Sequence, residues 1–291
     1  MKKIKKYDKI NKKKKGIKMD GKLYIVATPI GNLEDITLRA LRILKEVDII
    51  AAEDTRQTLK LLNHFKISKP LISYHRHNEE IKSNILIEKL KNGENIALVS
   101  DAGTPGICDP GEEIIKKAIE ENIQIIPIPG ACAFVNALIA SGVNTKEFIF
   151  LGFLPLNKKL RKEKLEEIDK SSKTIIIYEA PHKMKNTLED LKEILKNRKI
   201  ILARELTKIH EEFIRKNIDE LLENIDNLKG EMILIIEGNK EEINNENKLN
   251  LLTLEQHYEY YKKQGLDKKE IIKKIAKDRN VNKNEIYMKF I

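Results

Sequence analysis

The sequence is poor in several residue types, and each shortage excludes a class of protein. It has 2 cysteines, no tryptophan and 5% aromatic residues among 291 residues. Cys108 and Cys132 stand alone, without a C-x-x-C pair or histidines at zinc-ligand spacing, which argues against a disulfide framework and a structural zinc site. No apolar run approaches the roughly 18 residues of a membrane-spanning helix, and the basic N-terminus lacks the apolar segment of a secretory signal. We therefore expect a cytoplasmic protein that does not enter a membrane.

Several common catalytic motifs are also absent. Gly106 and Gly111 have the spacing of two P-loop glycines, but Glu112 and Glu113 follow where lysine and serine or threonine are needed. No G-x-G-x-x-G follows a strand-like segment, and neither G-x-S-x-G nor H-E-x-x-H occurs. These absences argue against a P-loop NTPase, a dinucleotide-binding Rossmann unit, an α/β-hydrolase and a zincin protease. The sequence predicts no metal site.

Nearly all of the net charge of +10 lies at one end of the chain. Residues 1–18 hold ten lysines and one aspartate, so the other 273 residues carry a net charge of only +1. A lysine block can bind nucleic acid, but such blocks are usually disordered, and this one contains no arginine. We predict that residues 1–18 form a disordered basic tail, because the first strand-like segment begins only after Met19.

Short apolar runs alternate with amphipathic segments from Lys22 onward. This alternation predicts an α/β fold, and the runs lack a strict polar alternation because both faces of such sheets are covered. The predicted strands are 23–28, 48–54, 71–74, 95–101, 124–128, 148–153, 174–180, 199–205, 211–218 and 231–238.

Breaks in this pattern predict the domain organisation. A first α/β domain spans 19–143 and a second spans 144–239. Residues 240–252 are polar and rich in asparagine, as expected of a linker. Residues 253–291 contain three helical segments and no strand. They are compatible with a helix-turn-helix module, or with a three-helix appendage that packs or dimerises.

Acidic residues stand at the ends of four predicted strands. They are Glu53 and Asp54, Asp101, Glu179, and Glu205. Ligands of open α/β sheets bind at the carboxyl ends of the strands, and carboxylates there suit a ligand with a positive charge or several hydroxyls. The alternative is that each carboxylate forms a turn or caps a helix.

Three loops rich in glycine and proline follow predicted strands, at 28–32, 100–111 and 129–130. In the longest, SDAGTPGICDPG, glycines allow positive φ and close backbone approach, while two prolines stiffen the chain. One such loop is a weak signal, but three in one domain indicate a cradle for a ligand.

Seven segments occur in an order that is characteristic of one family. They are VATPIGNLEDITLRAL, AAEDTR, ISYHRHNE, ALVSDAGTPGICDPG, IYEAPHKM, ARELTKIHEE and GEMILIIEG. Over about residues 20–290 the chain resembles the tetrapyrrole-methylase-like class of S-adenosylmethionine (SAM) enzymes, and within it the ribose methyltransferases of bacterial 16S ribosomal RNA (rRNA).

The resemblance implies two α/β domains with SAM in the cleft between them, a homodimer, and no metal. It implies that the enzyme methylates the 2′-hydroxyl of a cytidine ribose in the decoding region of 16S rRNA, within the 30S subunit. The residues that match SAM-contacting positions are Pro29, Asp101, Gly103, Thr104, Gly106, Ile107, Ala131, Cys132, Tyr178, Glu179 and Ala180. Cys108 and Cys132 stand where the family leads us to expect serine, so a hydroxyl bond to SAM at these positions is lost.

The chemistry restricts the catalytic residues to a few types. Methyl transfer from a sulfonium is an in-line displacement, and a ribose hydroxyl is a weak nucleophile that benefits from a base or from a group that stabilises the alkoxide. The candidates are Glu53, Asp54, Arg56, Arg204 and Glu205, each of which could also form a structural ion pair between strand ends. His75 and His77 could bind RNA or act as bases, although a surface histidine without either role is more common. Fold alone does not fix the substrate, so a tetrapyrrole methyltransferase and a non-catalytic RNA-binding assembly factor remain alternatives.

Overall fold

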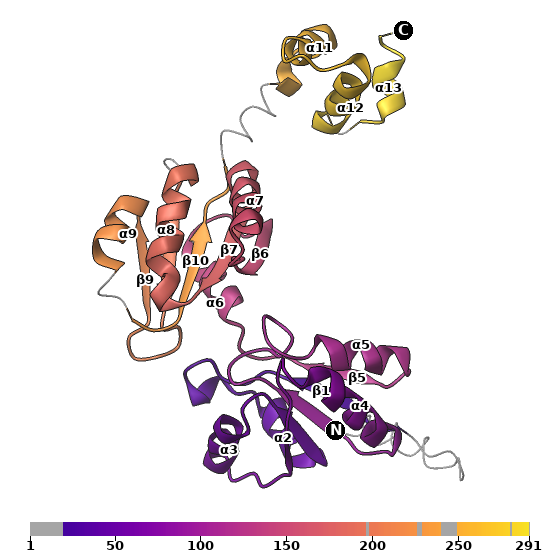
Figure 1. Cartoon of the computed structure of the whole chain (residues 1–291), viewed down its shortest axis with the longest axis vertical. Coiled ribbons are helices and arrows are strands. Elements are labelled where there is room, and N and C mark those ends of the chain that lie inside the picture. Colours follow the sequence, from indigo (N-terminus) through magenta and orange to yellow (C-terminus); the bar gives the residue numbers. More distant parts are fainter. Residues whose placement is uncertain (1–19, 196–197, 226–228, 240–248, 280, 291) are drawn as a thin grey trace, which may run out of the picture. The chain divides into compact units, whose positions relative to one another are not determined.

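The computed structural model describes residues 20–195, 198–225, 229–239, 249–279 and 281–290 (Figure 1). The predicted tail and residues 240–248 of the predicted linker lie outside these ranges. The chain divides into two compact units, one of residues 1–140 with 203–212 and the other of residues 141–202 with 213–291. The domain boundaries at 143/144 and 239/240 stay predictions.

The first unit is built on a five-stranded sheet in the order β3-β2-β4-β1-β5, and every pairing in it is parallel. The strands are β1 (Leu23–Val26), β2 (Ile49–Ala52), β3 (Leu71–Ser73), β4 (Ile96–Val99) and β5 (Ile125–Ile128). Each falls within a predicted strand. The edge strand β5 contains Pro127, which is exposed and pairs in register with Ile25 of β1.

Helices cover both faces of this sheet. They are α2 (Leu38–Glu46), α3 (Thr55–His64), α4 (Glu79–Lys91) and α5 (Glu112–Glu120), with the short 3-10 helix η2 (Leu33–Asp35) before α2 and with α6 (Ala133–Ser141) after β5. Successive strand residues point to opposite faces, so Ile49 packs with α4 and α5 whereas Ile50 packs with α2 and α3. Thr37 caps α2, because its side chain accepts a hydrogen bond from the backbone N–H of Ala40.

The strand order places a change of direction between β2 and β4. The chain leaves β2 towards the β3 edge and leaves β4 towards the β5 edge. Where neighbouring parallel strands send their connections in opposite directions, the carboxyl ends of the two strands frame a ligand site. Here those ends carry Glu53 and Asp54 after β2 and the 100–111 loop after β4.

The second unit contains a mixed sheet in the order β6-β7-β10-β8-β9. Its strands are β6 (Phe148–Phe153), β7 (Thr174–Glu179), β8 (Ile200–Arg204), β9 (Glu212–Lys216) and β10 (Met232–Ile236), and its helices are α7 (Lys158–Lys170), α8 (Pro181–Leu195) and α9 (Ile218–Asn224). β6 runs parallel to β7, whereas β10 is antiparallel to β7. The predicted α/β fold class, with two sheets and a C-terminal helical part, is confirmed.

The C-terminal helices form a cluster with its own core. These helices are α11 (Leu254–Lys262), α12 (Lys268–Asp278) and α13 (Lys283–Tyr287). Thr253 and Asp267 begin the first two with complete capping boxes, which involve Gln256 and Glu270. The core consists of Leu249, Tyr261, Ile271, Ile272, Ile275, Ala276 and Ile286. None of the helices among the described residues is long and apolar enough to cross a membrane.

A buried polar network joins α11 to α12. The His257 side chain is fully buried and stacks on Tyr261. The carboxylate of Asp278 lies 3.1 Å from His257 Nε2 and accepts a hydrogen bond of 2.5 Å from the Tyr261 hydroxyl. Arg279 Nε donates to His257 Nδ1 at 3.2 Å, so the imidazole is neutral and carries its proton on Nε2. Burial lowers the pKa of His257, in agreement with this neutral form.

We predict that Asp278→Ala destabilises the helical cluster by about 2–3 kcal/mol, because it leaves a buried hydroxyl and a buried imidazole without their shared acceptor. Hydrogen exchange of the full chain should show faster exchange in α11 and α12, with β1–β5 unchanged. Glu259→Gln is the control, since its ion pair with Lys262 is exposed and should contribute little. Unchanged exchange in Asp278→Ala would contradict a stabilising role for the network.

Candidate active site

The three glycine-rich loops of the first unit are tied together by hydrogen bonds. Thr28 and Gly103 form an antiparallel bridge, with Thr28 N–H donating to Gly103 O at 2.8 Å and Gly103 N–H donating to Thr28 O at 3.1 Å. Thr104 Oγ1 donates to the carbonyl of Ala131 at 3.1 Å. The loops after β1, β4 and β5 therefore form one assembly, as the sequence pattern predicts for a cradle.

Glycine is required where these loops approach one another. Gly103 has φ +82°, and a Cβ there would lie 3.2 Å from Cγ2 of Ile30. A Cβ on Gly130 would lie 2.8 Å from the Cβ of Ala27. At Gly106, with φ +81°, a Cβ would lie at an ordinary contact distance of 3.8 Å from Ile115 Cδ1, so the backbone conformation rather than a close approach favours glycine there. The first two glycines let the loops approach one another, and Gly106 permits a turn that residues with a side chain rarely adopt.

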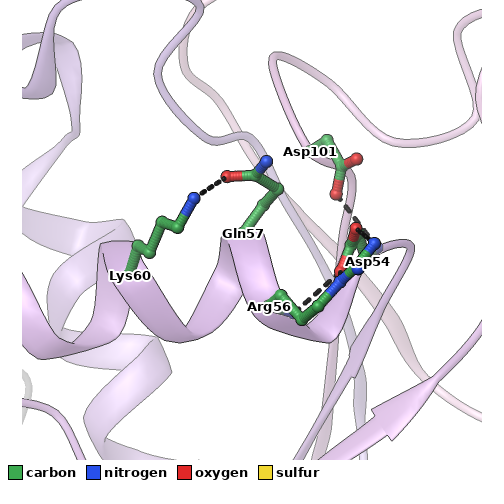
Figure 2. A network of polar contacts seen from close by, with 5 residues as sticks. All are labelled: Asp54, Arg56, Gln57, Lys60 and Asp101. Atoms are coloured by element: carbon green, nitrogen blue, oxygen red, sulfur yellow. Dashed lines mark hydrogen bonds and ion pairs between the residues drawn. The ribbon is translucent and has the colours of Figure 1, made fainter.

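Two of the acidic strand ends meet in this assembly (Figure 2). Asp54 N–H donates to Asp101 Oδ1 at 2.9 Å, and Asp54 begins α3 by accepting from Arg56 N–H at 2.8 Å. The guanidinium of Arg56 also donates two hydrogen bonds to the Asp54 carboxylate, of 3.0 and 2.7 Å. Gln57 and Lys60 on the next turn bond to each other. The structure thus joins Asp54, Arg56 and Asp101 into one network.

The carboxylates of this region differ in acidity. The hydrogen bonds from Arg56 lower the pKa of Asp54 to about 2, so Asp54 is a poor proton acceptor. Burial raises the pKa of Glu53 and of Asp101. Burial and the neighbouring Glu53 raise the pKa of Asp109 to about 6. Glu53, Asp101 and Asp109 are therefore more basic than Asp54.

Asp109 is a residue that the sequence reasoning missed. It lies in the 100–111 loop, and its carboxylate faces Glu53 and Asp101, with the Ser100 side chain as a hydrogen-bond partner. Its position between Cys108 and Pro110 resembles an ordinary turn. The available signal was a second aspartate in a loop already singled out for ligand binding.

Arg204 and Glu205 lie at the start of a tight turn. Arg204 Nε pairs with Glu212 at 2.7 Å, and Glu205 pairs with Lys208 at 3.0 Å. Glu205 and Thr207 both have positive φ, which is strained for a β-branched residue such as Thr207. The turn packs on the loop after β1, since a Cβ on Gly31 would lie 2.7 Å from Thr207 Oγ1.

Tyr178, Glu179 and Ala180 belong to the second unit. The Tyr178 ring packs edge-on against Phe150 and Phe153, with centroid distances of 4.9 and 5.8 Å. Glu179 is 5% exposed and accepts hydrogen bonds from Ala180 N–H at 2.8 Å and from Thr187 Oγ1 at 2.7 Å. Its carboxylate is thus held at the start of α8.

Cys132 and Ile107 complete the set of predicted SAM residues in the first unit. Burial raises the pKa of the Cys132 thiol, and the carbonyl of Cys132 accepts from Asn136 Nδ2 at 3.0 Å. Pro29 is buried, whereas Ile107 is 38% exposed. Among the described residues, no group of three or more His, Cys, Asp or Glu side chains has a metal-binding arrangement.

The chain belongs to the tetrapyrrole (corrin/porphyrin) methylases, since the sequence model of that family matches residues 22–222. It is a methyltransferase of a SAM-dependent family. Solved structures show the same fold. The methyltransferase CobJ aligns with a TM-score of 0.59 and 16% identity, covering 75% of this chain and 94% of CobJ. Uroporphyrin-III C-methyltransferase from Thermus thermophilus, complexed with S-adenosyl homocysteine, gives 0.55 and 14%, covering 75% of this chain and 97% of the enzyme.

Much higher identity links the chain to proteins named Ribosomal RNA small subunit methyltransferase I. The protein from Halalkalibacterium halodurans is 53% identical, covering 92% of this chain and 93% of its own length. The protein from Bacillus subtilis is 52% identical over the same shares of the two chains. The resemblance described from the seven sequence segments is confirmed.

We predict that Asp54→Asn leaves the melting temperature close to that of the unaltered chain, because asparagine is as good a helix cap as aspartate. Asp54→Ala, which removes the cap, should lower the melting temperature by about 2–4 °C. Calorimetric melting of both variants checks this. A melting temperature of Asp54→Asn as low as that of Asp54→Ala would contradict the capping role.

Proposed function

We propose that the chain transfers a methyl group from SAM to the 2′-hydroxyl of a cytidine ribose in the decoding region of 16S rRNA. The observation that carries the proposal is the bridged assembly of three loops, in a chain 53% identical to a protein named for methylating small-subunit rRNA. The cytidine, the ribose position and the decoding region come from the resemblance of the seven sequence segments.

SAM supplies a methyl group on a positively charged sulfur. The bridged glycine-rich loops and the carboxylates at the ends of β2 and β4 suit such a cation. We assign the binding of SAM in the first unit to Pro29, Asp101, Gly103, Thr104, Gly106, Ile107, Ala131 and Cys132. In the second unit, Tyr178, Glu179 and Ala180 join them, and SAM then occupies the cleft between the two domains.

We assign different catalytic roles to Glu53 and Asp54 because their pKa values are shifted in opposite directions. Glu53 takes the proton of the ribose hydroxyl, because its raised pKa suits a base whereas the pKa of Asp54, about 2, does not. The side chain of Arg56 is 86% exposed, and it holds an RNA phosphate while Asp54 fixes its position. Arg204 contributes positive charge near the ribose, and Glu205 orders the turn that follows through its bond to Lys208.

The C-terminal helices offer a basic surface for the 30S subunit. Lys269, Lys273 and Lys277 are exposed and recur every four residues along α12, so they lie in one row on its solvent face. A folded RNA is held mostly through its phosphates, over a wide surface. We therefore assign RNA docking to this cluster and methyl-donor binding to the loops.

We also propose a homodimer that acts in the cytoplasm. α6 is apolar on several sides and exposes Val135 (43%) and Ile139 (69%), which suits burial against a second copy. The two alternative functions have weaker support. The tetrapyrrole methyltransferases are similar at 14–20% identity, which shows the fold alone, and an idle assembly factor has no need of the bridged glycine-rich loops.

The first test compares the full chain with a chain that ends near Asn245. We predict that both bind SAM with similar affinity in calorimetry and that the shorter chain methylates 30S subunits at least about tenfold more slowly, because it lacks the phosphate contacts. Ribose methylation should be mapped on the 16S rRNA of the same reactions, and of cells with and without the gene. Equal loss of binding and methylation would contradict separate roles, and methylation of no cytidine would contradict the proposed function.

The second prediction concerns the base. The rate constant of methyl transfer should rise as the pH increases through the raised pKa of Glu53, because Glu53 accepts a proton only when ionised and loses that ability as the pH falls. Glu53→Gln should lower kcat by about 10²-fold with little change in SAM affinity. The control is Glu46→Gln, whose carboxylate pairs with Arg42 on the exposed face of α2. A wild-type kcat in Glu53→Gln would exclude Glu53 as the base.

A further inference from the structure

The segment Tyr74–Glu80, which follows β3, contacts the 100–111 loop at several points. The Glu79 carboxylate accepts a hydrogen bond from Gly111 N–H at 2.7 Å. The hydroxyl of Tyr74, a fully buried side chain, accepts from Ile114 N–H at 3.2 Å. Arg76 Nη2 donates to the carbonyl oxygen of Cys108. The sequence reasoning considered only the two histidines of this segment.

These contacts replace a cap that the loop lacks. Gly111 is the N-cap of α5 and has no side chain to satisfy the first N–H groups of that helix. Glu79 and Tyr74 supply the acceptors from another part of the chain. The end of the loop is thus fixed by side chains of the Tyr74–Glu80 segment. Gly111 itself has φ +149°, a conformation that residues with a side chain rarely adopt.

Arg76 acts on the middle of the loop. Cys108 has φ +62°, a left-handed conformation that is uncommon for residues other than glycine and persists where surrounding contacts enforce it. The hydrogen bond from Arg76 to its carbonyl is such a contact. Cys108 therefore serves through its backbone, which explains why a thiol in place of a hydroxyl is compatible with this loop.

Arg76 also places a positive charge among the carboxylates of the site. Its charge lowers the pKa of Glu53, at the end of β2, and of Asp109, in the loop itself, against the effect of burial. The other groups that act on these two carboxylates are Asp101, His75 and the Ser100 hydroxyl. Of these groups, Arg76 carries a positive charge that does not depend on pH.

We propose that Arg76 is a positioning residue for methyl-donor binding, which holds Cys108 through its carbonyl and sets its charge beside Glu53 and Asp109. Tyr74 and Glu79 hold the far end of the same loop. This inference rests on the proposed function, because it assumes that the 100–111 loop binds SAM. It assigns no proton transfer to Arg76.

The two parts of this role have different pH dependences. Without the guanidinium, the pKa of Asp109 rises above its value of about 6, so the carboxylate that attracts the cationic ligand is neutralised at a higher pH. Ligand affinity that depends on this ionisation is present above the pKa and is lost as the pH falls through it. In a variant without the guanidinium, raising the pH therefore restores the part of the ligand affinity that depends on charge. A loss of affinity caused by a change in the shape of the loop should persist at every pH.

The experiment measures SAM affinity by calorimetry on the full chain, from about pH 6.5 to about pH 8.5, a range that begins just above the pKa of about 6 of Asp109 in the unaltered chain. We expect Arg76→Gln to bind SAM about tenfold more weakly at the low end of this range and to regain most of that loss at the high end. Arg76→Lys, which keeps the charge, should retain the pH profile of the unaltered chain. The matched control is Arg42→Gln, which removes an exposed arginine paired with Glu46 on α2 and should follow the unaltered chain throughout.

Three outcomes would overturn the inference. One is a loss of affinity in Arg76→Gln that is the same at every pH, which would leave only a structural role. Another is a wild-type profile in that variant with normal melting. The third is equal behaviour of Arg76→Lys and Arg76→Gln. If the unaltered chain bound no SAM, the proposed function itself would fail, and this result is distinct from a failure confined to Arg76.

Discussion

The backbone bridge between Thr28 and Gly103 is the contact on which the rest of the site depends. It joins the loop after β1 to the long loop after its neighbour β4, the central strand of the sheet, and Thr104 extends the connection to the loop after β5. Parallel strands bring their carboxyl ends to the same edge of a sheet but do not fix the loops beyond them. Hydrogen bonds between the loops provide that order, and close packing between Gly103 and Ile30 maintains it.

The positive and negative charges of the chain lie in different places and suit different ligands. Carboxylates gather at the ends of β2 and β4, partly buried, where burial raises the pKa of three of them. Lysines lie in an exposed row along α12. A small cation needs few, close and poorly solvated partners, whereas a polyanion needs many solvated ones. This contrast supports assigning the methyl donor to the loops and the RNA to the helices.

The sequence predicts the strands and the cradle well, for physical reasons that are local. Nine strands of the described residues lie within predicted apolar runs, because strands covered on both faces need continuous burial, and the glycines of the three loops mark close backbone approach. The tenth, β9, lies within the more polar segment 211–218 and is mostly exposed. The direction of β10 could not be predicted, since an apolar run looks the same in a parallel and an antiparallel pair. The low pKa of Asp54 and the raised pKa of Asp109 depend on Arg56 and Glu53 in space. The contacts of Arg76 and Glu79 with the loop after β4 join residues about 32 positions apart, and no periodicity of the sequence reports them.

Pro127 in β5 limits how two copies of the chain can meet. An edge strand normally offers a row of free N–H and C=O groups to which the edge of another sheet can add. Proline has no N–H, and in sheets it is tolerated where that missing donor would face outward. Because Pro127 stands in the middle of the edge strand, a second copy cannot continue the sheet there by regular hydrogen bonding. Association at this side of the unit therefore has to use side chains, such as those that α6 exposes, and the same proline protects the edge against indiscriminate strand addition.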